Sequence, residues 1–424
     1  MLFNYLLITM SDQYTPTGGQ TIFPRINFLK TFSSRLEQRI ANGRVFLGGV
    51  IDNLFGDATL DLDFARTKSI GDLVTFSRAS SGTYVGSDGL IKTSPVNLLT
   101  YSEQFDQSAW AKENVSLTPN ASTAPDGTTT AEEVLATGSG RHRVSQLVSG
   151  SVGYVFSIFV KSNGTSHISI KCSGSDIATE FDIVNGTIAR SAPNGGLTDP
   201  FVTPLANEWY RIGGTVSTSS NWLIGTSDGT SSYSSAADIS YTAQPGDAYY
   251  IWGAQLEESS TATDYIPTGA TISGAPRFDH DPVTGESLGL LIEEERTNLI
   301  VDSTDLDLGK VGANLPSIST DTNQVLPDGQ IGTSKFIVFG AGISRARLRV
   351  SGSYTGTFAA SFYWKLKDGG TWARAYGNVT NTGSLLYYDI TCAGLGIPEG
   401  SEVYVTFGQI EAGSFPTSYI PTTG

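Results

Sequence analysis

Trp252-Gly253-Ala254-Gln255-Leu256-Glu257 is the stretch that decides the fold, because the chain nearly repeats it at its carboxyl end. It is followed by Tyr265-Ile266-Pro267-Thr268-Gly269. The end of the chain reads Phe407-Gly408-Gln409-Ile410-Glu411 and then Tyr419-Ile420-Pro421-Thr422-Thr423-Gly424. Two matching blocks in the same order indicate two copies of one domain.

The starts of the two copies match as well. Asn97-Leu98-Leu99 opens the first copy, and Asn298-Leu299-Ile300 opens the second. A Pro-Asp-Gly turn begins 28 residues after Asn97 and 29 residues after Asn298. A start, an internal turn and an end in one order therefore define the repeat. Duplicated β domains more often bind than catalyse, so the repeat also weakens most enzyme interpretations.

The composition favours β-structure with many tight turns. Hydrophobic residues make up 39% of the 424 residues and charged residues only 16%, while 48 residues are glycine. Glycine suits turns, whereas valine, threonine and tyrosine suit strands. The net charge of −15 argues against binding to nucleic acid or to an anionic membrane surface. Two cysteines and three histidines cannot build a zinc framework, and no cofactor is expected.

Short runs of alternating or continuous apolar residues predict strands in both copies. Tyr154 to Val160 is a nearly continuous apolar β run, and Phe181 to Ile188 is a hairpin around Asn185-Gly186. Leu60 to Phe64 and Val74 to Arg78 alternate with the period of a strand. The predicted fold is all-β, with tandem antiparallel jelly-roll β-sandwiches and a short, partly helical N-terminal anchor. The predicted parts are an anchor at 1–56, a small β unit at 57–96 plus 271–297, a first module at 97–270 and a second at 298–424.

The first 56 residues differ from the rest of the chain. Phe28, Phe32, Leu36 and Ile40 form one stripe of a predicted helix, which Asn27 can cap. This locally basic helix either packs on its own domain or anchors the subunit in a larger assembly. The apolar start from Met1 to Ile8 lacks the features of a secretory signal and is too short to span a bilayer. It is either an extended arm or a stretch that precedes a true start at Met10.

Several blocks resemble a module that is common in virion proteins of tailed bacteriophages. They are Leu62 to Arg66, Phe76 to Ser80, Pro276 to Asp279 and Gly289 to Leu299. The Asn-Leu-Leu-Thr-Tyr-Ser-Glu start, the Pro-Asp-Gly turn and the Trp-Gly-Ala-Gln-Leu-Glu end resemble jelly-roll modules of those proteins, which are akin to concanavalin-like or galactose-binding-like carbohydrate-binding modules. The resemblance covers residues 58 to 424. The second copy departs from it, since it has Phe407 for Trp252 and lacks the longer Tyr-Ser-Glu-Gln-Phe start.

The resemblance implies a structural protein of the virion surface, such as a head, collar or tail fibre or a spike subunit, that projects its modules for host attachment. It implies partners in the particle, namely capsid, portal, collar or tail proteins, and host surface glycans as candidate ligands. Fibres are usually closed homo-oligomers, and a trimer is expected before a dimer. The alternative is a polysaccharide depolymerase tailspike, but such enzymes usually carry short regular repeats, and this repeat spans 201 residues from Asn97 to Asn298. A secreted lectin is a third interpretation, which the missing signal disfavours.

Glycan binding requires exposed aromatic faces, so the six tryptophans are the first candidates. Trp209 and Trp252 lie in apolar runs and are expected in the core. Trp222 and Trp372 lie in polar stretches that are expected to be loops, and they are candidate ligand residues. Trp110 follows a polar segment and is a third candidate, or else covers a sheet edge. We assign no catalytic residues.

Other chemistry has weaker support in the sequence. Asp279-His280-Asp281 and the acidic run from Asp302 to Asp307 offer oxygen ligands, but neither has the spacing of a calcium loop, so polar turns are expected. A structural calcium ion between distant loops is an alternative that the sequence leaves open. Glycoside cleavage needs two carboxyl groups facing each other. In the groups Glu132-Glu133, Glu257-Glu258 and Glu293-Glu294-Glu295, neighbours on a strand point to opposite faces, so these carboxylates are expected to guard solvated edges.

Overall fold

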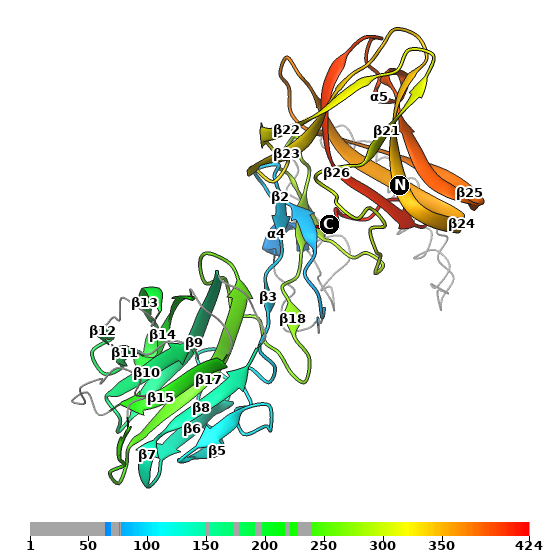
Figure 1. The fold of residues 1–424 in the computed structure, drawn as a ribbon. Coiled ribbons are helices and arrows are strands. Elements are labelled where there is room, and N and C mark those ends of the chain that lie inside the picture. The colour runs from blue at the N-terminus through cyan, green and yellow to red at the C-terminus, as the bar shows by residue number, and fades with distance from the viewer. Residues whose placement is uncertain are drawn as a thin grey trace, which may run out of the picture. The chain divides into compact units, whose positions relative to one another are not determined.

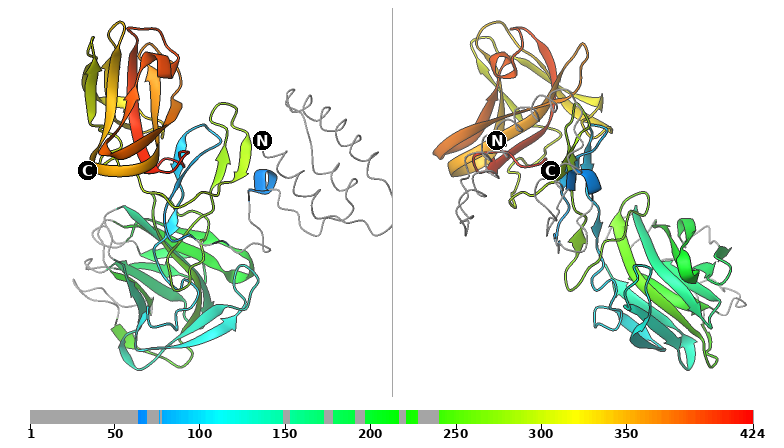
Figure 2. Two further views of the ribbon diagram at one scale, coloured as in Figure 1. Left: turned by 90° about the vertical axis from the view of Figure 1, so that its right-hand side faces the viewer. Right: turned by 180° about the vertical axis from the view of Figure 1, so that it is seen from behind.

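The computed structural model describes residues 64–68, 76, 78–148, 153–172, 178–190, 197–216, 221–227 and 240–423. The predicted anchor residues Phe28, Phe32, Leu36 and Ile40 lie outside these ranges. The described chain is almost all β, and its strand pairs are antiparallel, as predicted (Figures 1 and 2). Its helical elements are short: α4 (Phe64–Thr67), η1 (Ala206–Glu208) and α5 (Cys392–Leu395). The predicted strand from Leu60 is therefore wrong at Phe64, which begins α4.

The first module contains two six-stranded sheets (green and cyan in Figure 1). One sheet has the order β12 (Thr187–Arg190), β11 (Thr179–Asp182), β10 (His167–Cys172), β15 (Asn221–Ser227), β8 (Arg143–Leu147), β4 (Ala111–Glu113). The other has the order β13 (Thr198–Pro204), β14 (Tyr210–Val216), β9 (Tyr154–Asn163), β17 (Ala248–Glu258), β6 (Ala131–Ala136), β5 (Val115–Ser122). A short pair, β7 (Ser139–Arg141) with β16 (Ser240–Thr242), completes the module.

A single core lies between these two sheets. Phe156 and Ile158 of β9 belong to the same buried cluster as Ile168 and Ile170 of β10, and each of these side chains is fully buried. Burying one such side chain contributes about 1.5–3 kcal/mol relative to leaving it exposed. The predicted Asn-Gly hairpin is confirmed, since β11 and β12 flank it and Gly186 has a left-handed φ of 65°.

The second module is built on one sheet that curls into a half-barrel (yellow to red in Figure 1). The path runs β21 (Leu308–Gly312), β24 (Ser344–Leu366), β26 (Glu402–Ala412), β23 (Ile331–Val338), β22 (Ser317–Val325), and β25 (Ala373–Ile390) pairs with β24. Leu348 and Phe362, from opposite halves of β24, lie in one core cluster. Register shifts on β24, with Gly352 and Gly356 at positive φ, accompany the bend of this long hairpin.

A small set of strands connects the segment before the first module with the segment that follows it. The pairs are β1 (Thr83–Val85) with β2 (Ile91–Thr93), β19 (Phe278–His280) with β20 (Ser287–Leu290), and β3 (Val96–Asn97) with β18 (Ser273–Gly274). The Val85 amide donates to the Asp279 carboxylate at 2.7 Å, and the Nδ1 of His280 lies 3.0 Å from the Val85 carbonyl oxygen. These strands hold together residues that lie almost two hundred positions apart in the sequence.

The repeated sequence blocks form the same buried hydrogen-bond network in both modules. The Asn97 amide donates to the carbonyl oxygens of Ala254 and Ile266, and its oxygen accepts from the amides of Leu99 and Leu256. In the second module, Asn298 bonds the equivalent four groups, on Gly408, Ile420, Ile300 and Ile410. Each asparagine therefore ties the start of its module to the last strand and to the exit segment.

A glutamine and a glutamate extend this network. Gln255 donates to Glu257 at 2.8 Å and accepts from the Ile266 amide, while Glu257 accepts from both the amide and the hydroxyl of Thr263. The second module repeats these bonds with the matching residues Gln409, Glu411, Thr417 and Ile420. The Gln-x-Glu sequence is therefore structural, because each buried polar group has a partner.

The hydrogen bonds show which residues of the two modules are equivalent, and this correspondence differs from the one read from the sequence. The Ala254 amide donates to the Ser102 carbonyl, and the Gly408 amide donates to the Ser303 carbonyl. Ala254 and Gly408 are therefore equivalent positions. Phe407 then takes the backbone position of Gly253, and both have a left-handed φ, of 52° and 62°. The alignment of Phe407 with Trp252 is therefore wrong by one residue. Ser303 also bonds Tyr419 at 2.6 Å as Ser102 bonds Tyr265, so the second module retains the core of the longer start.

Candidate functional site

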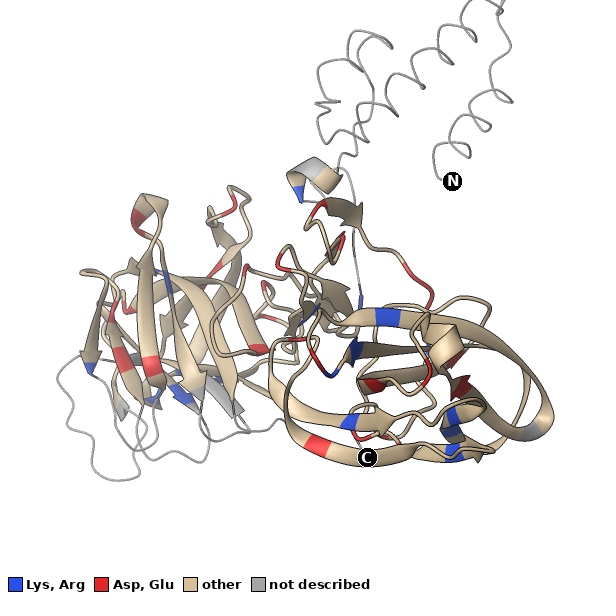
Figure 3. Ribbon diagram, turned by 90° about the horizontal axis from the view of Figure 1, so that it is seen from above, with Lys and Arg blue, Asp and Glu red and all other residues tan. Residues whose placement is uncertain are grey.

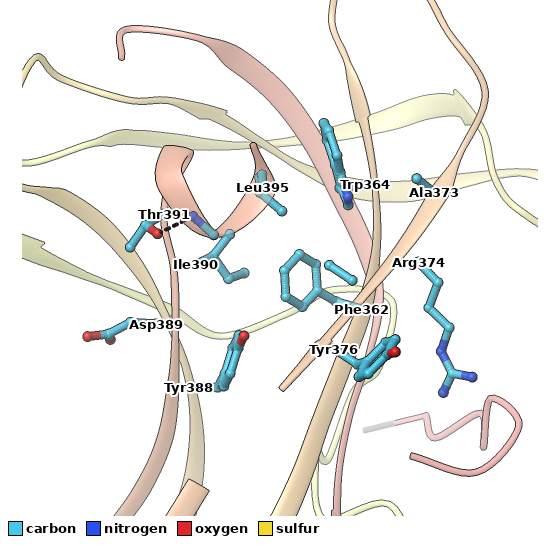
Figure 4. Close-up of a pocket in the computed structure, with 12 residues that line it drawn as sticks. Phe362, Trp364, Ala373, Arg374, Tyr376, Tyr388, Asp389, Ile390, Thr391 and Leu395 are labelled. Atoms are coloured by element: carbon cyan, nitrogen blue, oxygen red, sulfur yellow. Dashed lines mark hydrogen bonds between the residues drawn. The ribbon is translucent and has the colours of Figure 1, made fainter. Parts of the chain in front are cut away.

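A pocket of about 330 Å³ opens within the bend of β24 and β25 in the second module (Figure 4). Aromatic rings contribute much of its lining, and α5 supplies one wall with Thr391 and Leu395. The volume lies at the lower end of the roughly 300–1,000 Å³ that is typical of small-molecule sites. Its lining residues are Phe362, Trp364, Ala373, Arg374, Ala375, Tyr376, Tyr388, Asp389, Ile390, Thr391, Gly394 and Leu395.

Strand pairing, a glycine on β25 and the cap of α5 position the residues that line the pocket. Phe362 pairs with Ala375 and Trp364 pairs with Ala373, so each of these two rings on β24 stands beside a small residue on β25. A side chain at Gly377 would lie 2.5 Å from the Tyr388 hydroxyl, so this glycine leaves room for the tyrosine. The Thr391 hydroxyl accepts from the Gly394 amide at 2.9 Å and caps α5 (dashed in Figure 4).

The rings differ in their exposure. Phe362 is buried and belongs to the core, while Trp364 and Tyr388 are half-buried and pack against it. Tyr376 lies at the rim with 68% of its surface exposed. Burial raises the pKa of the Tyr388 hydroxyl, which therefore stays protonated at neutral pH. The pocket thus offers partly exposed ring faces and neutral hydroxyls, the groups that suit an uncharged polyhydroxylated ligand.

The charged residues of the lining are held by other groups. The Asp389 carboxylate accepts two hydrogen bonds from Arg347, at 2.7 and 3.0 Å, and these bonds hold its pKa below its usual range. Arg374 points away from the pocket in Figure 4 and donates to the Ser361 hydroxyl and the Thr417 carbonyl. Arg211 makes the same two contacts in the first module, with Ser157 and Thr263, so this arginine is a structural clamp.

The predicted ligand tryptophans do not lie in this pocket. Trp110 is 1% exposed, donates to the Tyr101 carbonyl and packs on Phe105, so its faces cannot stack on a sugar and its assignment is corrected to the core. Trp222 lies within β15, paired with Gln146 and Cys172, and not in a loop, while its side chain is outside the described part.

Trp372 is the structural counterpart of Trp209. The Trp209 indole donates to the Thr123 carbonyl, and the Trp372 indole donates to the Val325 carbonyl, in both cases just before a Pro-Asp-Gly turn. Trp209 is buried, as predicted, and so is Trp252. Trp372 packs beside Leu326 and Phe407, which gives it a role in packing. Trp364 and Tyr376 are the aromatic candidates that sequence reasoning missed, because an apolar strand pattern does not reveal a ring at the open end of a core.

Paired carboxylates were expected at solvated edges, and this interpretation is wrong for three of them. Glu257 is fully buried in the network, and Glu293 is bonded to Arg277 at 2.9 Å. Glu132 is 2% exposed, and burial, reinforced by the nearby Asp106 carboxylate, raises its pKa to about 8. Since a substrate cannot reach a carboxyl group at this depth, Glu132 and Asp106 do not form a hydrolytic site.

Metal and membrane features are reported only for the described residues. Within those ranges, no group of three His, Cys, Asp or Glu residues is placed to hold a metal ion. The Asp302 carboxylate instead accepts from the amides of Thr304 and Asp305, which is the expected polar turn. In the same part of the chain, no helix is long and apolar enough to cross a membrane.

No protein-family model matches the sequence, and no curated protein is significantly similar to it.

Proposed function

We propose that this chain is a structural protein of the surface of a tailed-bacteriophage virion, a fibre or spike subunit whose jelly-roll modules attach the particle to host glycans. The proposal combines the module resemblance with the pocket in the second module, which carries the ligand part of the argument. Half-buried Trp364 and Tyr388 provide ring faces within one concave site, and exposed Tyr376 stands at its rim. Stacking of such rings on sugar rings is how β-modules hold glycans.

The start and the exit of each module lie together, which suits this role. Each closes its start against its exit through a fully bonded asparagine, so the two chain ends of a module leave from one place. Such modules can be strung along a projecting fibre without rearranging their cores. The proposed assembly is a homo-oligomer, with a trimer expected before a dimer, that contacts other particle proteins through the segment before residue 57.

A glycan array with the intact oligomer tests the ligand part. Tyr376→Ala should lower glycan binding about tenfold, because stacking of one ring contributes on the order of 1 kcal/mol or more. The melting temperature should stay unchanged, since this ring is 68% exposed. Phe415→Ala is the matched control, because Phe415 is 54% exposed and does not line the pocket.

Immunogold electron microscopy of purified particles tests the location. Antibodies against the second module should decorate a fibre, collar or spike position on intact virions. Unlabelled particles would contradict the virion assignment. Labelled particles together with no binding on the glycan array would support a structural protein of the virion that does not bind host glycans.

A further inference from the structure

Three arginines stand in a row on the outer side of β24. Arg345, Arg347 and Arg349 alternate with the buried residues Ala346 and Leu348, so the three side chains share the face away from the core. Figure 3 shows blue bands of basic residues on strands near the carboxyl terminus. A row at this spacing presents guanidinium groups at about 7 Å intervals along the strand.

The central arginine is rigidly held. Arg347 makes two hydrogen bonds to Asp389, and its guanidinium carbon lies 3.7 Å from the centre of the Tyr387 ring. Two parallel bonds to a carboxylate and a stacked ring fix the plane of the group. Tyr387 remains 38% exposed, which leaves ring surface beside the row.

The flanking arginines leave the row with an excess of positive charge. Arg345 shares the same carboxylate through a longer contact of 3.3 Å. Arg349 is exposed, and within the described residues it has no carboxylate within 4 Å. Its guanidinium lies against the backbone of Gly309 on β21, where a side chain would collide with it. Three cations therefore face one anion.

The net charge of the second module allows the positive charge of the arginine row to attract an anionic ligand. Residues 298–424 contain ten acidic and eight basic residues, whereas residues 97–270 contain seventeen acidic and seven basic residues. The first module therefore repels an anionic ligand, and the nearly neutral second module can admit one.

We propose that the arginine row with Tyr387 binds the carboxylate groups of an acidic polysaccharide, a polymer of sugar acids. This inference rests on the proposed glycan-binding function and narrows its ligand class. Arginine binds carboxylates bidentately, as Arg347 already does with Asp389, and Arg349 is the guanidinium that is available to do so. The exposed part of Tyr387 favours a sugar over a peptide, because it offers aromatic surface on which a pyranose ring can pack.

Isothermal titration of the full-length chain with oligogalacturonate tests the proposal. Arg349→Gln should weaken binding about tenfold, as expected for the loss of one charge-assisted contact, and added salt should weaken wild-type binding. Lys92→Gln is the matched control, because it removes the same charge from the Lys92–Asp88 pair, which is not part of the arginine row, and should leave the affinity unchanged.

Polyglutamate and a neutral glycan are two further ligands that separate failure of this inference from failure of the proposed function. Equal affinity of wild type and Arg349→Gln for oligogalacturonate, or equal affinity of wild type for polyglutamate, would overturn the acidic-glycan site. Binding of a neutral glycan that depends on Tyr376, with no binding of oligogalacturonate, would also overturn it while the proposed function stands. Absence of binding to acidic and neutral glycans alike would overturn both.

Discussion

Asn97 and Asn298 explain at the residue scale why the two copies share so much of their sequence. Each side chain satisfies four backbone groups at the point where the module starts and ends. An aliphatic residue there would leave buried amides and carbonyls without partners, at about 1–3 kcal/mol for each group. Aspartate could not donate to the two carbonyls. Asparagine is the residue that meets all four requirements.

Phe407 shows how one module tolerates an unfavourable backbone. Its φ of 52° is left-handed, a conformation that costs a non-glycine residue on the order of 1 kcal/mol or more. Its ring compensates by stacking on Tyr419, with the two planes 1° apart and the centroids 4.3 Å apart. The first module uses Gly253 at this position and packs Trp252 on Tyr265 instead. The two modules therefore fill one aromatic site from adjacent backbone positions.

Glu132 makes the stability of the first module depend on pH. Its pKa is raised to about 8 in the folded state, so the folded chain holds a proton that the unfolded chain has lost above about pH 4.5. This contribution to stability is fully present below the unfolded pKa and is lost as the pH rises through the folded one. We expect the free energy of unfolding to fall by up to about 1.4 kcal/mol per pH unit between these two values. Denaturant unfolding at several pH values measures the slope.

The neighbouring carboxylate supplies the control for this prediction. Glu132→Gln should flatten the pH slope, because the amide keeps the shape and cannot titrate. Glu133→Gln should keep the slope of the wild type, since Glu133 points to the opposite face and bonds Asn163 at 2.6 Å. An identical slope in wild type and Glu132→Gln would show that another group titrates.

At the scale of elements, contacts between strands and the exit segments of the modules hold these segments in place. The exit of the second module is held by residues around β19 and β20. Glu293 accepts from the amide and the hydroxyl of Ser418, and Arg277 donates to both Glu293 and Ser418. The Ile91 amide of β2 also donates to Pro327 in the Pro-Asp-Gly turn. Asp264 is the counterpart of Ser418 in the first module, and a carboxylate there would repel a glutamate.

Glu293→Ala should therefore destabilise the second module by about 2–3 kcal/mol, because it leaves Arg277 and the Ser418 amide without their charged partner. Glu295→Ala, two residues away, should cost less than about 0.5 kcal/mol, since Glu295 is exposed. Hydrogen exchange measured by mass spectrometry over residues 413–423 should increase in the first variant alone. Unchanged exchange there would mean that the exit segment is held without Glu293.

The whole molecule combines an acidic first module with a nearly neutral second one. Net charge of one sign keeps copies soluble and apart, so assembly requires a dedicated contact. We expect that deletion of residues 1–56 leaves a soluble chain with intact modules that no longer joins the particle, because the predicted apolar stripe is removed. Particle incorporation measured after complementation tests this, with circular dichroism as the check on folding. Normal incorporation of the truncated chain would refute the anchor assignment.

The sequence by itself determined the all-β class and the repeated blocks of start, turn and end. These follow from local signals: strand periodicity, Asn-Gly and Pro-Asp-Gly turns, and a repeated polar block whose side chains must all be bonded when buried. It also placed Trp209 and Trp252 in the core, because both lie in apolar runs.

Only the tertiary structure decided which polar and aromatic residues are buried and which are available. Trp372 and Trp110 look like loop or edge residues in sequence, yet partners far along the chain engage or bury them. Glu132 and Glu257 look like solvated edge carboxylates, yet strand pairing turns them inward. The pocket beside Trp364 and the row of arginines depend on how β24 bends and which strands flank it. Bending and burial arise from contacts between distant residues, which local sequence patterns do not encode.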